Sequence, residues 1–234
     1  MSRIKVRNGG VCPDDALFIV EAFDSTLPEL EAIGSGEMWG SQPFSQKNGF
    51  LEETVKDVNM SEKYRLTGEG DALRVFIAEV AVGGPAGFPA MPHAHRNSDL
   101  RYREANDGTI FLSVGAAMVR EDWLPGHIKS QFHAEDIRTE LEGREDFVYL
   151  DVMVTDYRAG NCRHGVGKAL IRRCIEYGIE KGKSSLYVEA WAGNNRKLVR
   201  YYEQRGFSTV GEYSMRRSNG TTWLGTLLRM DLAG

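Results

Sequence analysis

Phe147-Val-Tyr-Leu-Asp-Val-Met-Val154 is an apolar run, and the turn Gly165-Val-Gly167 follows it; the two together indicate the architecture of the chain. The apolar run is typical of a buried strand, and residues 165–181 have the apolar spacing of a helix. Glycines at such a turn let backbone N–H groups converge on an anion, which the helix dipole also attracts. The stretch therefore predicts a strand, a helix and an anion-binding turn, although a tight turn packed against a neighbour would use the same glycines.

Hydrophobic periodicity predicts the elements on either side of this stretch. Helices are expected at 16–33, with a second short piece starting at Pro28, and at 51–64, 134–141 and 194–205. Strands are expected at 73–82, 109–119, 185–190, 207–214 and 222–231. The alternation predicts an α/β (α+β) fold, in which helices cover both faces of a mixed sheet.

Composition narrows the class of protein. The chain has 234 residues, of which 41% are hydrophobic and 26% charged, as is usual for a globular protein with a sizeable core. Three cysteines without a zinc-type pairing indicate a reduced, cytoplasmic setting. The net charge of -4 gives no reason to expect nucleic acid, and no apolar run approaches the ~20 residues of a membrane span.

A long polar segment, residues 83–108, separates two of the predicted strands. A loop of this length inside a compact domain usually has a function or is mobile. His93 and His95 share one side of an extended chain within it, but a metal site needs a third ligand that the sequence does not supply. We therefore expect no metal.

The C-terminal part of the chain resembles the GCN5-related N-acetyltransferase (GNAT) family. Cys162-Arg-His-Gly165-Val-Gly167 lies on that family's Gln/Arg-x-x-Gly-x-Gly/Ala loop. Asn195, Tyr202 and Gly206-Phe207 have the spacing of an Asn, a Tyr and a Gly-Phe pair that the family carries after its fifth strand, whose start Leu186-Tyr-Val-Glu189 resembles. The resemblance covers about residues 147–232.

The resemblance implies a GNAT-like, mostly antiparallel central sheet in a single acyl-CoA N-acyltransferase domain, 1–234. Residues 1–68 would be its variable helical part, 83–108 a long insertion between strands, and 147–232 the coenzyme A-binding core. Two departures concern the phosphate loop. Cys162 replaces the usual Gln or Arg, and the loop from Tyr157 to Gly165 is longer than in the family, so Arg163 or Arg158 would have to supply the missing contact.

The resemblance also implies which residues meet the coenzyme. Backbone N–H groups at Met153 and Val154 would polarise the thioester carbonyl, and Asn195 would contact coenzyme A or cap its helix. The phosphate loop would bind the pyrophosphate through Arg163, His164, Gly165, Val166, Gly167 and Lys168.

Two residues are candidates for proton transfer. Tyr202 would protonate the departing thiolate, since a phenol near pKa 10 suits a thiolate near 8.5, although it could be a core aromatic. Asp151 shares a strand face with Tyr149 and Met153 and is the candidate base, although it could be a hydrogen-bonded strand carboxylate. Glu189 and Glu79 are the runner-up bases.

The resemblance therefore implies an N-acetyltransferase that moves an acetyl group from acetyl-CoA, as co-substrate, directly to a small-molecule amine. A homodimer is left open. Within the class, a peptide or protein acceptor stays open. Outside it, the chain could be a non-catalytic acyl-CoA sensor. A dinucleotide-binding protein is disfavoured, because the glycines come late in the chain and do not form a three-glycine fingerprint.

Overall fold

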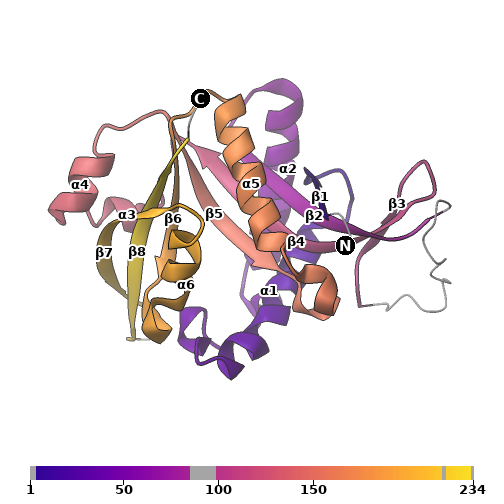
Figure 1. Cartoon of the computed structure of the whole chain (residues 1–234), viewed down its shortest axis with the longest axis horizontal. Coiled ribbons are helices and arrows are strands. Elements are labelled where there is room, and N and C mark those ends of the chain that lie inside the picture. The colour runs from indigo at the N-terminus through magenta and orange to yellow at the C-terminus, as the bar shows by residue number, and fades with distance from the viewer. Residues whose placement is uncertain (1–3, 85–98, 218–219, 233–234) are drawn as a thin grey trace. The chain divides into compact units, whose positions relative to one another are not determined.

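The computed structural model describes residues 4–84, 99–217 and 220–232 (Figure 1). His93 and His95 lie outside the described residues, as does most of the predicted insertion. The helices and strands are, in chain order, β1 (Ile4–Asn8), α1 (Asp15–Ala32), α2 (Phe50–Thr67), β2 (Leu73–Gly83), β3 (Tyr102–Glu104), β4 (Ile110–Glu121), α3 (Gly126–Lys129), α4 (Glu135–Leu141), β5 (Phe147–Thr155), α5 (Val166–Glu180), β6 (Ser185–Trp191), α6 (Gly193–Glu203), β7 (Ser208–Arg216) and β8 (Thr222–Asp231).

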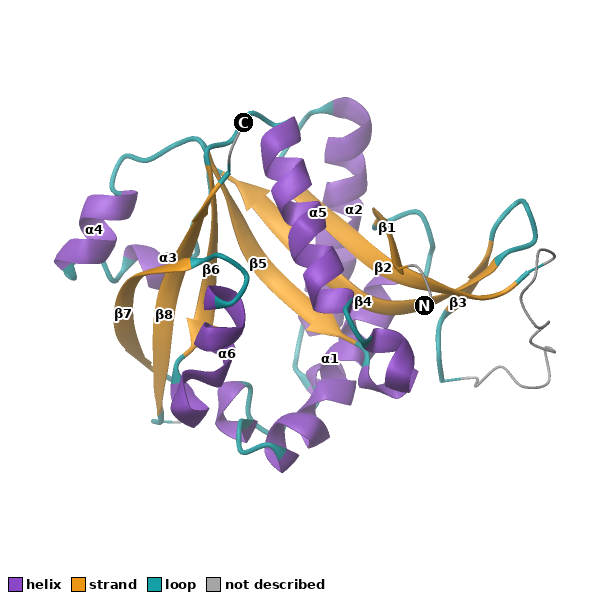
Figure 2. Cartoon of the chain, viewed as in Figure 1, coloured by secondary structure: helices purple, strands orange, loops and turns teal. Residues whose placement is uncertain are grey.

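These strands form one open sheet flanked by helices (Figure 2). The strand order is β1-β2-β4-β5-β6-β8-β7, and β3 pairs with β4. β5 and β6 run parallel, whereas β1 with β2, β3 with β4, and β8 with both β6 and β7 run antiparallel. The predicted fold class, with a mixed and mostly antiparallel sheet, is confirmed.

Several local expectations were wrong. Residues 1–68 are not only helical, because Ile4–Asn8 form β1, which pairs with β2 from Ile4↔Val80 to Asn8↔Phe76. α1 continues through Pro28 instead of restarting there. Burial of Leu27 and Leu30 on either side of it outweighs the missing hydrogen bond of the proline. The long insertion contributes a short strand, β3.

The chain divides into two compact units. The first comprises residues 1–29, 41–118 and 152–173. Its α2 is tied to β2 where the Ser61 hydroxyl accepts a hydrogen bond, 2.8 Å long, from the Val75 N–H. β1, β2 and β3 are held together by Glu79, whose fully buried carboxylate bonds the guanidinium groups of Arg7 at 2.5 Å and Arg103 at 2.5 Å. A buried charge is tolerated because it is paired in this way.

The start of α5 is fixed within the first unit by close packing. Val166 is fully buried, and the Asp156 N–H donates to the Val114 carbonyl oxygen at 2.9 Å. Gly115 on β4 is required there. A Cβ added to it would lie 2.6 Å from Val166 Cγ1 and 2.8 Å from the Val154 carbonyl oxygen. The glycine thus sets how closely α5 and β5 approach β4.

The second unit comprises residues 30–40, 119–151 and 174–234. β6 pairs with β8 along its whole length, from Ser185↔Asp231 to Trp191↔Gly225, and β7 closes the edge. One core cluster of this unit is strongly aromatic, and its buried aromatic side chains are Phe147, Tyr149, Tyr187, Trp191, Tyr213 and Trp223. The Trp223 indole N–H donates to the Met38 carbonyl oxygen at 3.1 Å, which ties residues 30–40 to this core.

We expect Gly115→Ala to lower the free energy of unfolding by about 1–3 kcal/mol, because the added methyl overpacks the contact with Val166 and the β5 backbone. Denaturant unfolding measures this cost. Gly126→Ala is the matched control, since its Cβ would meet nothing within 4 Å. Equal stability of the two variants would contradict the packing described above.

Candidate active site

The predicted phosphate loop is a capped 3-10 turn that leads into α5. Residues Tyr157–Arg163 form the turn, and the buried Asp156 caps it by accepting from the Arg158 N–H at 3.0 Å. Gly165 has φ 84°, a left-handed conformation that favours glycine. The first helical bond of α5 runs from the Ala169 N–H to the Gly165 carbonyl oxygen. The N–H groups of residues 166–168 therefore precede the hydrogen-bonded helix and are suited to an anion.

The side chains around this turn differ in how far they are exposed to solvent. His164, Gly165 and Lys168 are exposed. The Arg163 guanidinium lies 3.9 Å from the centre of the Tyr157 ring, which holds it at the loop surface. Val166 is buried, so it can contribute only its backbone to a ligand.

Arg158 is an unsuitable substitute for the missing loop Gln or Arg. Its guanidinium makes a two-point ion pair with Asp156, at 2.9 and 2.8 Å, and also bonds Glu21 at 3.3 Å. A fourth bond goes to the Asp99 carbonyl oxygen. These contacts make Arg158 a structural residue, which leaves Arg163 as the other candidate arginine of the loop.

The strand that precedes the loop ends its pairing with β6 before the predicted thioester position. β5 pairs with β6 from Phe147↔Ser185 to Leu150↔Val188, yet β5 continues to Thr155. Met153 and Val154 therefore follow the end of this paired register. The Val154 side chain is buried and that of Met153 is partly exposed, so the backbone is the natural source of any contact from Val154.

Asp151 follows Leu150, the last residue of β5 that pairs with β6, and is partly exposed. Its carboxylate accepts a hydrogen bond from Arg120 Nε at 3.0 Å. The Arg120 guanidinium in turn lies 4.7 Å from the centre of the Trp123 ring. The sequence left two roles open for Asp151, that of a base and that of a hydrogen-bonded strand carboxylate. The bond from Arg120 fits the second role as well as the first.

Tyr202 is almost fully buried on α6. Its ring makes edge contacts with Tyr201 at 5.4 Å and with Phe207 at 5.4 Å between centroids. Burial raises the pKa of the Tyr202 phenol, so the group stays protonated at neutral pH. A protonated phenol is what the role of acid requires, and the same burial also fits a core aromatic.

The backbone at Asn195 differs from the regular helix start that the sequence predicts. Asn194, Asn195 and Arg196 all have left-handed backbone conformations, with φ between 47° and 59°, and the N-cap residue of α6 is Ala192. The neighbouring Asn194 makes the anchoring contacts, donating to the Ser35 hydroxyl at 2.7 Å and to the Ile33 carbonyl oxygen at 2.8 Å. Asn195 itself is exposed, which leaves its side chain accessible to a ligand.

The second unit also brings together a polar cluster that the sequence revealed only in part. Glu189 on β6 accepts hydrogen bonds on one carboxylate oxygen from His127 Nε2, at 2.7 Å, and from the Tyr213 hydroxyl. Glu189 was a runner-up base, whereas His127 was missed. It lies after Pro125-Gly126 in a segment too short for periodicity to reveal. Glu79, the other runner-up, is enclosed by two arginines that lower its pKa against the effect of burial.

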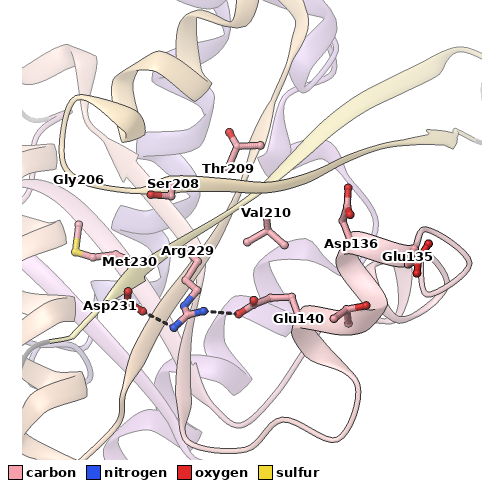
Figure 3. Close-up of a pocket in the computed structure, with 11 residues that line it drawn as sticks. Glu135, Asp136, Glu140, Gly206, Ser208, Thr209, Val210, Arg229, Met230 and Asp231 are labelled. Atoms are coloured by element: carbon pink, nitrogen blue, oxygen red, sulfur yellow. Dashed lines mark hydrogen bonds and ion pairs between the residues drawn. The ribbon is translucent and has the colours of Figure 1, made fainter.

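The second unit has a hollow between α4 and the β7–β8 hairpin (Figure 3). It has a volume of about 670 Å³. Glu140 crosses it to bond Arg229 at 3.0 Å, and Arg229 also bonds Asp231. None of the sequence-predicted site residues lines this hollow, and its cation and two of its acids already pair with one another.

No three side chains of the His, Cys, Asp or Glu type are grouped to hold a metal ion within residues 4–84, 99–217 and 220–232. Over the same ranges, no helix combines the length and apolar character that a membrane crossing requires.

Residues 114–207 match the family model described as the acetyltransferase (GNAT) family. The resemblance recognised in the sequence is thereby confirmed over residues 114–207. It contains β5, the glycine turn, α5, β6 and Tyr202.

Solved structures agree with this fold. The chain is similar to a protein described as a GNAT-family acetyltransferase from Desulfovibrio desulfuricans, with 15% identity, coverage of 99% of this chain and 100% of that one, and a TM-score of 0.54. An acetyltransferase structure from Acinetobacter baylyi matches at 12% identity, 99% and 94% coverage and a TM-score of 0.54. A GCN5-related N-acetyltransferase from Kribbella flavida matches at 16% identity, 98% and 98% coverage and 0.51. At these identities the likeness establishes the fold alone.

The pair of His127 and Glu189 makes the stability of the protein depend on pH. The hydrogen bond to Glu189 raises the pKa of His127, against the opposing effect of burial. A raised folded-state pKa stabilises the fold fully below the unfolded value of about 6.5 and loses that effect as pH rises through the folded value. We therefore expect His127→Gln to destabilise the protein more at pH 5.5 than at pH 9.

Denaturant unfolding at the two pH values measures this difference. His133→Gln is the control, because the His133 ring bonds the Ser130 carbonyl oxygen and not a carboxylate. A His127→Gln cost that is the same at both pH values would contradict the charged pair.

Proposed function

We propose that the protein is an N-acetyltransferase that moves an acetyl group from acetyl-CoA to a primary amine of a small molecule. The observation that carries the proposal is the glycine turn between β5 and α5, in a region that matches the GNAT family. The first backbone N–H groups of α5 and the exposed Lys168 suit a pyrophosphate. The small-molecule acceptor, the cytoplasmic location and a homodimer are parts of the proposal that rest on the sequence.

The chemistry assigns a task to each proposed residue. The turn, with Arg163, His164 and Lys168, holds the pyrophosphate, and Asn195 adds a polar contact to coenzyme A. Backbone N–H groups at Met153 and Val154 bond the thioester oxygen as negative charge develops on it. Removing one such donor costs a factor of ~10² to 10³ in other acyl-transfer enzymes.

Transfer itself needs two proton movements. An alkylammonium has a pKa of about 10 and must lose a proton before its nitrogen can attack. The departing sulfur must gain one, and the buried, protonated Tyr202 is the proposed donor. Asp151 is the base that the sequence proposes, although the bond from Arg120 occupies part of its carboxylate.

A thiol-release assay with acetyl-CoA and a panel of polyamines, amino acids, aminoglycosides and short peptides tests the proposal. Release that depends on a small amine supports it. Thiol release with peptides alone would show that the acceptor is a peptide and not a small molecule.

The rival function is a non-catalytic acyl-CoA sensor, and a specific observation favours it. Cys162 stands where the family has Gln or Arg, and the 3-10 turn Tyr157–Arg163 enlarges the loop. A sensor would bind acetyl-CoA without amine-dependent thiol release, so a binding measurement beside the assay separates the two functions.

We expect Lys168→Glu to weaken acetyl-CoA binding about tenfold or more, because a charge-assisted contact to phosphate is replaced by repulsion. The fold should tolerate the change, since Lys168 is exposed and an acid is favourable in the first turn of a helix. Calorimetry measures the affinity. Lys56→Glu, an exposed charge reversal on α2, is the control; equal affinities would remove the turn from the coenzyme site.

Replacement of the proposed acid should separate catalysis from binding. We expect Tyr202→Phe to lower kcat by a factor of ~10² or more, within the usual range for proton transfer, and to leave acetyl-CoA affinity unchanged. Tyr201→Phe, which changes the residue directly before Tyr202 on α6, is the matched control. Tyr202→Phe with wild-type turnover would assign the phenol to the core.

A further inference from the structure

The cluster around Glu189 has the construction of a histidine base held by a carboxylate. Glu189 Oε2 accepts from His127 Nε2 at 2.7 Å and from the Tyr213 hydroxyl, so two elements besides β6 fix its position. The carboxylate side chain is only 23% exposed and that of His127 is 35% exposed. The imidazole is therefore the part of the pair that is more open to solvent.

The position of the imidazole is fixed by its own turn. α3 is a single turn in which the N–H groups of Ile128 and Lys129 donate to the Pro125 carbonyl oxygen at 3.0 and 3.1 Å. The fully buried Ile128 anchors that turn in the aromatic core of the second unit. Because Nε2 of His127 bonds Glu189, its Nδ1 lies on the opposite side of the ring and can take a proton from another molecule.

A second observation points to a ligand at the same place. Tyr149 is fully buried, and its hydroxyl has no hydrogen-bond partner within the described part of the chain. Its pKa is raised, first by burial and then by the charges of Glu189 and neighbouring groups. A buried hydroxyl without a protein partner is rare in folded proteins, and a water or a bound molecule is the usual partner.

We propose that His127 is the general base for the acceptor amine, that Glu189 is its positioning residue, and that the Tyr149 hydroxyl bonds the acceptor. This inference rests on the proposed function. Nδ1 of His127 takes one proton from the ammonium, and the freed nitrogen attacks the thioester carbon. The new C–N bond forms and the C–S bond breaks. Tyr202 gives its proton to the sulfur and regains one from the nitrogen, so one proton remains on His127 and passes to solvent.

The groups around the imidazole favour this role. Both neighbouring carboxylates attract the imidazolium, and they raise the pKa of His127 above its ordinary value, with Glu189 as the first cause. Proton transfer from an amine of pKa about 10 becomes easier as the pKa of the base rises. The titratable and charged groups at this place come from four strands: Arg120, Tyr149, Asp151, Glu189 and Tyr213. Asp151 acts there as a fixed charge paired with Arg120.

The rate of transfer as a function of pH tests the proposal. We expect kcat/KM of the wild-type protein to fall at acid pH with the pKa of His127. His127→Gln should lose a factor of ~10² or more in kcat/KM and lose that acid limb, with acetyl-CoA affinity unchanged. His133→Gln should keep both the rate and the limb. A His127→Gln rate within threefold of the wild type, or an acid limb that persists in this variant, would show that His127 is not the general base.

Glu189→Gln tests the positioning residue, since the amide can still bond Nε2 but carries no charge. The acid limb of kcat/KM should move to lower pH, and NMR titration of the His127 ring should show the same shift. An unmoved limb or ring titration would overturn the pairing. The NMR titration needs no turnover, so it stands if the transferase proposal fails. Amine-dependent thiol release in the wild type with no effect of either variant would sink the inference alone.

Discussion

The parallel pairing of β5 with β6 is the constraint on which the rest of the structure depends. Two parallel neighbours cannot be joined by a tight hairpin and need a crossover, which α5 provides. The crossover must leave from the carboxyl end of β5, so the capped turn and the N-terminus of α5 lie at that end. Ligands of open α/β sheets bind at such strand ends. The place of an anion site therefore follows from the direction of two strands.

The carboxylates of this protein differ in the groups with which they are paired. Glu79 sits between Arg7 and Arg103, and Asp156 holds Arg158, so these buried carboxylates are structural. Glu189 differs from them, because its partners are an imidazole and a phenol instead of guanidinium groups. The imidazole can exchange a proton near neutral pH, whereas an arginine cannot. The kind of partner therefore separates Glu189, the proposed positioning residue, from the carboxylates that stabilise the fold.

The sequence predicted the elements whose periodicity is long and clear. β5, α5, β6 and the β7–β8 hairpin were expected within a few residues of their observed ends. The short elements β1, β3 and α3 were missed, because three to five residues carry too little pattern to separate them from loops. The left-handed run at Asn194–Arg196 was also missed, since tertiary bonds of Asn194 outweigh the helical preference of the segment. His127 escaped prediction because its pairing with Glu189 spans 62 residues of sequence.

In the proposed reaction, acetyl passes directly from coenzyme A to an amine. Incubation with acetyl-CoA labelled with deuterium in its acetyl group, followed by mass spectrometry of both protein and amine, distinguishes direct transfer from a covalent intermediate. We expect label in the amine product and none bound covalently to the protein. Label on Cys12, Cys162 or Cys174 that then passes to the amine would contradict direct transfer, and the absence of labelled amine across the panel would contradict the activity.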